Sequence, residues 1–204
     1  MEPMRLIFLL SLLMLLTGCS MEKSFINYGD LATYSGSGHL QMVVEIPAGT
    51  NKKFEYDYET NAFPADIKNG AERVIEFLAY PGNYGFIPST MMDSARGGDG
   101  DALDILLISE YLETRTLIEV LPIGILVLED SGKKDSKIIA VPVDERLRTI
   151  NITSYEQLDS EFSAAKRIIQ LWFLGYKGES IMEFKSWEDE IAAKGEIEKW
   201  LIKK

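Results

Sequence analysis

The stretch from Gly97 to Ile108 reads GGDGDALDILLI, a glycine-rich acidic loop followed directly by an apolar run typical of a strand. Three carboxylates, those of Asp99, Asp101 and Asp104, lie close together in this loop. Two carboxylates ~5 Å apart repel each other by about 3 kcal/mol at an effective dielectric of roughly 20, so crowded acids take up protons or bind cations. Carboxylate oxygens are hard ligands that suit Mg²⁺, Mn²⁺ or Ca²⁺. The stretch therefore predicts a metal site at the start of a strand.

Other interpretations of the acidic loop agree less well with its spacing. Asp-Gly pairs are common in surface turns, which leaves an ordinary acidic loop as the simplest alternative. A calcium loop of the EF-hand type needs an acid at its fifth position and glycine at its sixth, but counting from Asp99 these positions hold Leu103 and Asp104. The glycine-rich calcium repeat of β-roll proteins needs several copies, whereas this chain holds one imperfect copy. Asp99 and Asp101 are two residues apart, so on a strand their side chains would point to the same face. Asp104 would point to the other face, and its carboxylate meets theirs only if the backbone bends at Gly100.

The N-terminus carries the pattern of an export signal. Arg5 precedes the apolar run Leu6–Leu16, which is too short to span a bilayer, and small residues follow. The sequence LTGC at positions 16–19 resembles the lipobox of bacterial lipoproteins, in which the signal is cut before the cysteine and the thiol is acylated. We therefore expect a signal peptide over residues 1–18 and a lipid anchor on Cys19. The alternative is a plain signal peptide in which Cys19, the only cysteine of the chain, is incidental.

The lipobox resemblance implies an exported protein held on a bacterial membrane, on the periplasmic side or at the cell surface. Residues 19–38 are rich in Ser, Gly, Tyr and Asn, and we expect them to form a lipid-anchored tether with little fixed structure. Residues 39–204 have the length of one domain. The formal net charge of −11 argues against nucleic acid as a partner.

Strand-like runs dominate the chain from Gln41 to Val143. They are rich in Val, Ile and Leu, are separated by Gly, Pro, Asn and Asp, and have no helical segment between them. Such closely spaced strands predict an antiparallel barrel or sandwich, so the fold class is mainly β with α. The predicted strands are Met42–Ile46, Lys53–Tyr58, Ala102–Ser109, Ile118–Glu129 and Lys137–Val143.

Two helices are predicted after the strands. Ser154 and Gln157 have the spacing of a capping box, and apolar residues from Leu158 to Trp172 keep a three-four spacing. A second helix is predicted to begin after Ser186. Its buried side is expected to carry Trp187, Ile191, Ile197, Trp200 and Leu201.

Polar residues elsewhere in the chain supply what a phosphate-binding metal site needs. Taken singly, each is most often a solvated surface residue. Together they provide acids, cations and phenols, the mixture that holds metal ions and an anion with several phosphoryl oxygens. Zinc is not expected, because it favours His and Cys ligands and the chain has one of each. These polar residues are Glu45, Lys53, Glu55, Arg73, Tyr80, Tyr84, Asp130, Asp135, Lys137, Tyr176 and Lys177.

The sequence DGDALD at positions 99–104 resembles the signature of the family I soluble inorganic pyrophosphatases, whose usual form is DGDPLD. Other segments are similar to that family in order and spacing, and they are Val43–Pro47, Tyr80–Gly85, Asp130–Pro142 and Tyr176-Lys177. The resemblance implies a five-stranded, OB-like closed barrel with two C-terminal helices packed against it. It also implies hydrolysis of pyrophosphate to two phosphates with several Mg²⁺ ions.

The resemblance implies roles for individual residues. Asp101 matches the carboxylate that takes a proton from the attacking water. The implied metal ligands are Asp99, Asp104, Asp135 and Asp130. The implied phosphate-binding residues are Lys53, Arg73, Tyr84, Lys137, Tyr176 and Lys177, and the residues implied to lie behind them are Glu45, Glu55 and Tyr80. This agrees with elementary chemistry, because bridging metals make hydroxide available near neutral pH and cations neutralise the leaving phosphate.

The chain also departs from the family pattern. Ala102 replaces the usual proline, and the stretches Glu45–Lys53 and Arg73–Tyr80 are each one residue shorter, so Lys68 is an alternative for the role of the arginine. Bacterial relatives assemble as hexamers, and we expect a homo-oligomer. The alternative function is that of a membrane-anchored, non-enzymatic lipoprotein that binds divalent cations or phosphates. Other phosphoanhydrides are alternative substrates.

Overall fold

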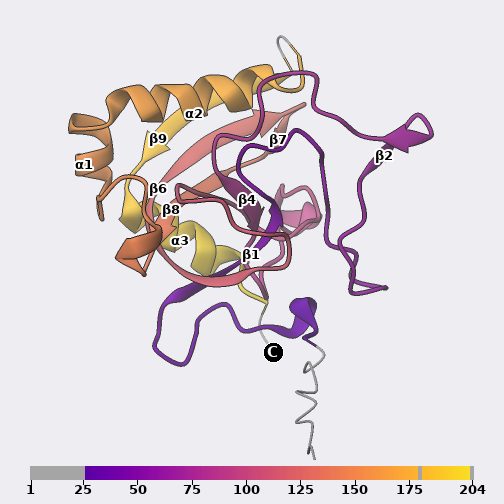
Figure 1. The fold of residues 1–204 in the computed structure, drawn as a ribbon, viewed down its shortest axis with the longest axis horizontal. Coiled ribbons are helices and arrows are strands. Elements are labelled where there is room, and N and C mark those ends of the chain that lie inside the picture. Colours follow the sequence, from indigo (N-terminus) through magenta and orange to yellow (C-terminus); the bar gives the residue numbers. More distant parts are fainter. Residues whose placement is uncertain (1–25, 179–180, 203–204) are drawn as a thin grey trace, which may run out of the picture.

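One long strand organises the sheet. The computed structural model describes residues 26–178 and 181–202. Strand β6 (Leu117–Asp130) pairs antiparallel with β1 (Leu40–Ile46) and with β8 (Lys137–Pro142). Strand β6 is longer than β1 and β8. It pairs with β1 through its first residues and with β8 further along its length (Figure 1).

Two short strands connect β1 to β8. Strand β4 (Asn83–Phe86) pairs with β1 and with β5 (Asp104–Leu107), and β5 runs parallel to β8. The pairings therefore return to β1 and form a ring of five strands, in agreement with a mainly β fold that also contains helices. Two predictions are corrected. Strand β4 lies where the sequence predicts no strand, and the β5–β8 pair is parallel, where an antiparallel arrangement is predicted, because the chain crosses over through β6 between them.

Shorter strands extend the sheet. Strand β7 (Lys133–Lys134) forms a hairpin with the end of β6, and β9 (Met182–Glu188) pairs along β6. Strands β2 (Ile67–Lys68) and β3 (Ala71–Glu72) form a separate hairpin that projects from the body of the molecule (Figure 1). Trp187, which was predicted to lie in a helix, lies in β9, because pairing with β6 extends the chain up to Glu188.

Three α-helices lie in the described part of the chain, where the sequence predicted two. Helix α1 (Tyr155–Ser160) begins after Ser154, whose side chain accepts a hydrogen bond from the backbone of Gln157, so the predicted cap is confirmed. The backbone leaves the helical conformation at Phe162, and α2 (Ser163–Gly175) starts beyond it. The single helix predicted from Leu158 to Trp172 is therefore two.

Helix α3 (Glu190–Trp200) begins later than predicted. The carboxylate of Asp189 accepts hydrogen bonds from two backbone N–H groups of the first turn, which fixes the start of the helix. Short 3₁₀ helices occupy Tyr28–Asp30, Ser94–Arg96 and Glu145–Leu147.

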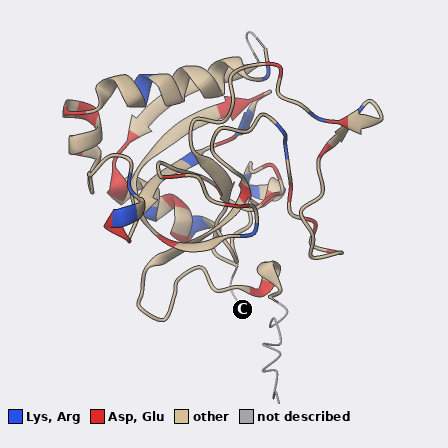
Figure 2. Cartoon of the chain, in the orientation of Figure 1, with Lys and Arg blue, Asp and Glu red and all other residues tan. Residues whose placement is uncertain are grey.

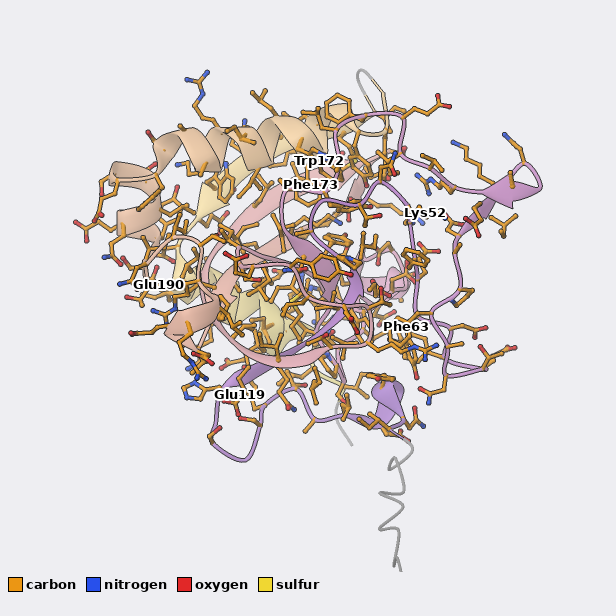
Figure 3. All side chains as sticks on the ribbon, in the orientation of Figure 1. Lys52, Phe63, Glu119, Trp172, Phe173 and Glu190 are labelled. Atoms are coloured by element: carbon orange, nitrogen blue, oxygen red, sulfur yellow. The ribbon has the colours of Figure 1, made fainter. Side chains whose placement is uncertain are left out.

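The helices cover two sides of the strands. On β5, Leu106 packs in a cluster with Trp172 of α2, whereas Ile105 packs in another with Trp200 of α3. Trp172 and its neighbour Phe173 are residues of α2, and their side chains are buried beneath the helix (Figure 3). Strands that are buried on both faces consist of continuous apolar residues, which explains the uninterrupted apolar run after Asp104. Truncating one such core leucine to alanine costs about 2–5 kcal/mol.

Residues Lys53–Tyr58 form a loop and not the predicted strand. Only isolated bridges hold them, such as the one between Asp57 and Ala62. The backbone N–H of Glu55 donates to the carbonyl of Pro64 at 3.3 Å, but Pro64 has no N–H with which to continue a ladder.

Residues 26–38 pack on the domain, so the prediction of a loose tether is wrong for them. Thr33 donates a hydrogen bond to the carbonyl of Pro88 at 2.8 Å, and the ring of Tyr28 meets the ring of Phe63 edge-on at 5.1 Å. The contacts of the half-buried Tyr28 and the buried Thr33 outweigh the Ser- and Gly-rich composition of this segment.

The predicted signal peptide and Cys19 lie outside the described residues. Among the residues described, no helix has the length and apolar character needed to cross a membrane.

Candidate active site

Segments that are far apart in the sequence meet at one cleft of about 380 Å³. Acidic and basic positions are interspersed along the whole fold (Figure 2), and many of both kinds face this cleft. Every predicted site residue in the described chain lines the cleft, except Arg73. The charged lining residues are Glu45, Lys53, Glu55, Asp99, Asp101, Asp104, Asp130, Lys133, Lys134, Asp135, Lys137 and Lys177. The aromatic lining residues are Phe54, Tyr56, Tyr58, Tyr80, Tyr84, Phe86, Phe173 and Tyr176.

Glycines shape the acidic loop. Gly100 has a φ angle of +102°, a conformation that side chains disfavour, and a Cβ atom on Gly98 would lie 2.2 Å from the carbonyl oxygen of Met92. The backbone N–H of Asp101 donates to the Asp99 carboxylate at 3.0 Å, and the Asp101 carbonyl accepts from Met92 at 2.7 Å. The backbone therefore bends at Gly100, as predicted, and both carboxylates line the cleft.

The surroundings of Asp101 favour proton uptake. Burial raises the pKa of its carboxyl group, and the negative charges of Asp99 and Asp104 raise it further. A carboxylate with a raised pKa is a stronger base at neutral pH.

The ammonium group of Lys137 joins the acidic loop to the β6–β7 hairpin. Lys137 is buried and contacts the carboxylates of both Asp104 and Asp135. The sheet register explains the first contact, because Asp104 and Lys137 are paired across β5 and β8. Burial opposes the charge, but the two carboxylates outweigh it and hold the pKa of Lys137 well above its usual value. Lys137 therefore remains positively charged at the base of the cleft.

A second ion pair joins the hairpin to α2. The Nζ of Lys177 lies 2.5 Å from the Asp130 carboxylate, which lowers the pKa of Asp130. The preceding residue, Tyr176, stacks on Trp172 with ring centroids 4.7 Å apart. This stacking fixes the end of α2, so that Tyr176 and Lys177 both line the cleft.

Glu45 also lines the cleft. Its carboxylate accepts a hydrogen bond from the backbone of Tyr56 at 2.7 Å, while burial raises its pKa to about 8. The Tyr56 hydroxyl accepts from the backbone of Gly29 at 3.0 Å and donates to Asn61 at 2.8 Å. The segment that precedes β1 thus supports the loop that carries Tyr56.

Arg73 lies outside the cleft lining. Its guanidinium donates to Asp66 at 3.0 Å, and the same carboxylate oxygen lies 3.8 Å from the Nζ of Lys53. Lys68, the alternative, is exposed on β2 and does not line the cleft either. Of these three cations, only Lys53 lines the cleft, and the β2–β3 hairpin that carries Lys68 projects from the body of the molecule (Figure 1).

The sequence analysis missed two lysines and part of the aromatic wall. Lys133 and Lys134 line the cleft, and their position between Asp130 and Asp135 was a signal that could have indicated them. Tyr58 also lines it although its side chain is largely exposed. It lies on an irregular loop, where no periodicity indicates which side chains share a face.

The charges of the cleft suit hard divalent cations. Seven carboxylates and five lysines line it, so a polyvalent anion would enter a site that is already rich in negative charge. Within residues 26–178 and 181–202, no three Asp, Glu, His or Cys side chains are grouped as a ready metal site, and Lys137 instead bridges Asp104 and Asp135. The donor set fits Mg²⁺ or Mn²⁺ by its chemistry, since carboxylate oxygens are the preferred ligands of both.

Comparisons with known proteins agree with this arrangement. Residues 42–203 match the inorganic pyrophosphatase family. An inorganic pyrophosphatase of Neisseria meningitidis serogroup B is 35% identical over 171 residues, which cover 80% of this chain and 89% of that protein. One of Sulfolobus acidocaldarius is 44% identical over 108 residues, which span 52% of this chain and 56% of that protein.

A solved structure extends the similarity to the fold. The crystal structure of the inorganic pyrophosphatase from Thermus thermophilus superposes with a TM-score of 0.71 at 31% identity, and the match covers 85% of this chain and 95% of that one. The similarity therefore includes the strands, the helices and the segments that meet at the cleft. The chain belongs to the inorganic pyrophosphatase family.

Proposed function

We propose that the protein hydrolyses pyrophosphate to two phosphates by attack of water, with Mg²⁺ held by the carboxylates of the cleft. The observation that carries this proposal is the meeting of the acidic loop, the β6–β7 hairpin and three lysines in one cleft. Family membership supports the same reaction. These lysines are Lys53, Lys137 and Lys177.

The metal ligands in this proposal are Asp99, Asp104, Asp135 and Asp130. Bound Mg²⁺ would lower the pKa of the attacking water and offset the charge of the phosphate oxygens. Lys137 contacts two of these aspartates, so it keeps their negative charges from repelling one another.

The phosphate oxygens are held by cations and phenols that surround the carboxylates. Lys53, Lys137 and Lys177 all line the cleft, and Lys137 is the most buried of the three. The hydroxyl groups of Tyr84 and Tyr176 add neutral donors, which bind phosphate oxygens without adding charge. A substrate contact of Arg73 stays a prediction from the family resemblance.

Asp101 accepts the proton of the attacking water. Its carboxylate lines the cleft and is made more basic by burial and by neighbouring acids. When the water attacks phosphorus, its proton passes to an Asp101 oxygen, and the bond to the bridging oxygen breaks to release phosphate. The negative charge of Glu55 also raises the pKa of Asp101, and Tyr80 packs against Tyr84 in the lining of the cleft.

The decisive measurement is phosphate release from pyrophosphate with Mg²⁺, beside ATP and tripolyphosphate at equal concentration. We expect rapid, Mg²⁺-dependent release from pyrophosphate and slow release from the other two. No release from pyrophosphate would contradict the proposal and would favour the non-enzymatic, ion-binding lipoprotein. The presence of Asp101 and the lysines in one cleft argues against that alternative.

We also propose that Cys19 is acylated and that the protein is exported and membrane-anchored. Ile26, the first described residue, follows Cys19 by seven positions. A chain of that length spans at most about 25 Å, so the domain would stay close to the membrane surface. Cys19→Ser should move the protein from the membrane fraction to the soluble fraction or leave it unprocessed. A processed variant that stays membrane-bound would contradict the anchor.

A homo-oligomer is proposed on the basis of exposed apolar side chains. Ile168 and Leu171 lie one turn apart on α2 and are each 59% exposed, and Leu78 on a nearby loop is 69% exposed. Contiguous apolar surface of this kind marks interaction sites. Light scattering after gel filtration should report a mass above that of the 23.0 kDa chain, and Leu171→Glu should lower it. A monomeric wild-type protein would contradict the proposal.

A further inference from the structure

Two separate arms of the fold carry the carboxylates of the cleft. The acidic loop carries Asp99, Asp101 and Asp104, and the β6–β7 hairpin carries Asp130 and Asp135. A cation bound by both arms tolerates ligand-distance errors of roughly 0.2 Å, so the spacing of the arms decides how well it binds. The residues that hold the arms at this spacing therefore bear on cation affinity.

The end of helix α3 reaches the hairpin. Trp200 is buried, and its indole N–H donates to the Glu196 carboxylate at 2.6 Å. The other oxygen of Glu196 accepts a hydrogen bond from Lys134 at 2.7 Å. Lys134 lies in β7, directly before Asp135. Glu196 thus holds the hairpin arm by the residue next to one of its carboxylates.

The same helix end reaches the acidic loop. The carbonyl of Trp200 accepts a hydrogen bond from Met91 at 2.9 Å, and the next residue, Met92, donates to the carbonyl of Asp101 at 2.7 Å. On the other side of the indole, the guanidinium of Arg96 lies 4.7 Å from the ring centroid of Trp200. Trp200 is therefore linked to the hairpin through Glu196 and to the acidic loop through Met91 and Met92.

We infer that Glu196 and Trp200 are positioning residues that set the spacing of the two carboxylate arms and, through it, the affinity for divalent cations. The identity of the cation site rests on the proposed function, but the contacts of Glu196 and Trp200 do not. Neither residue lines the cleft, so each acts through its neighbours.

The burial of Glu196 supports a specific role. A buried carboxylate is costly, and apolar side chains of similar size often stabilise a protein as well or better. Glu196 is only 9% exposed. Burial opposes its charge, but Lys134 and Trp200 outweigh burial and hold the pKa of Glu196 below its usual value. Its charged contacts fix a distance between β7 and α3 that an apolar side chain would leave adjustable.

The test is equilibrium binding of Mg²⁺, and of Mn²⁺ followed by electron paramagnetic resonance, to the full domain without substrate. Glu196→Gln should weaken cation binding about 3- to 10-fold, which is less than the ~10–100-fold cost of changing a direct partner of a metal ligand. Turnover at saturating Mg²⁺ should stay close to that of the wild type. Lys134→Met should weaken binding similarly, and the double variant should add little, because both changes break one interaction.

Ile152→Val is the matched control. Ile152 is buried in the core cluster on the α2 side, so this change lowers stability without touching either arm, and cation affinity should not change. If Glu196→Gln lowers the melting temperature but leaves cation affinity at the wild-type value, the inference is wrong. Should that variant fail to fold, Trp200→Phe keeps a ring in place and removes the indole donor, and the same comparison applies. A wild-type protein that binds cations but does not release phosphate would contradict the proposed function alone.

Discussion

The base and the rim of the cleft both present a lysine, but they hold it by different means. The base, defined here as Asp104, Asp135 and Lys137, lies on or beside the paired strands β5 and β8, and the Lys137 side chain is 2% exposed. The rim, defined as the loop Lys53–Tyr58, has only isolated bridges, and the Lys53 side chain is 21% exposed. Continuous strand pairing therefore positions the charges of the base, whereas isolated backbone hydrogen bonds, such as the one from Lys53 to the carbonyl of Arg73 at 3.1 Å, position those of the rim.

This difference determines where the loss of a charged partner has the larger effect on stability. At the base, Lys137 and Asp135 are largely shielded from water, so the loss of a partner there leaves a charge with a large desolvation cost. At the rim, water solvates the groups that lose a partner, and exposed ion pairs contribute little to stability. Substitutions at the base should therefore lower both stability and rate. Matched substitutions at the rim should mainly weaken substrate binding.

The largest effect is expected for Lys137→Met, because it leaves Asp104 and Asp135 without their cation. Breaking a buried ion pair from one side costs about 3–5 kcal/mol of unfolding free energy. Removing a charge that stabilises the transition state should also lower kcat by ~10²–10³-fold. Urea unfolding and phosphate release measure the two effects. Lys185→Met, on the exposed side of β9, is the control and should change neither. A stable, active Lys137→Met variant would remove the distinction between base and rim.

Asp101→Asn should lower turnover without unfolding the protein. The substitution keeps the shape of the side chain and removes the base, a change typically worth ~10²–10⁴-fold in rate. Mg²⁺ binding should persist, because Asp104 and Asp135 remain. Rapid-quench kinetics at saturating Mg²⁺ measure the loss, and Asp159→Asn on α1 is a control outside the cleft. Full turnover in the Asp101→Asn protein would assign proton transfer to another acid, such as Glu45 or Glu55.

Lys53→Met at the rim is the counterpart of Lys137→Met at the base. A charge-assisted hydrogen bond to a phosphate oxygen contributes about 1.5 kcal/mol, so kcat/KM should fall roughly tenfold. The unfolding free energy should change by less than about 0.5 kcal/mol, as is usual for surface substitutions. Steady-state kinetics and urea unfolding on the same preparations separate the two quantities. A stability loss as large as that of Lys137→Met would show that the rim is held like the base.

The smallest effect on kcat/KM is expected for Tyr56→Phe. The substitution removes the hydroxyl that joins Gly29 to Asn61, and a hydrogen bond of this kind contributes about 0.5–1.5 kcal/mol to stability. Because the loop that carries Lys53 then loses part of its support, kcat/KM should fall less than in Lys53→Met. Tyr111→Phe, which changes an exposed tyrosine, should have no effect on either quantity. Unchanged stability in Tyr56→Phe would show that the segment before β1 does not support the rim.

The sequence predicted local features of the fold better than its long-range strand pairing. The bend at Gly100 and the cap at Ser154 depend on a few consecutive residues, which the sequence shows directly. The strand predicted at Lys53–Tyr58 is a loop because its partner segment contains Pro64, and pairing partners are distant in the chain. Trp187 was placed in a helix for the same reason, since its pairing with β6 is a long-range contact.

By itself, the sequence determined the acidic loop, the two strands on either side of Asp130 and Asp135, and the likeness to the inorganic pyrophosphatases. It did so because glycine spacing, charge density and apolar runs act between near neighbours. Only the tertiary structure decided that Arg73 stays outside the cleft, that Lys137 lies between two aspartates, and that α3 contacts Lys134 and Met91 beside the two carboxylate arms. These features depend on strand register and on side chains that meet across the core. Such contacts are set by how the whole chain buries its apolar surface, and no short stretch of sequence contains them.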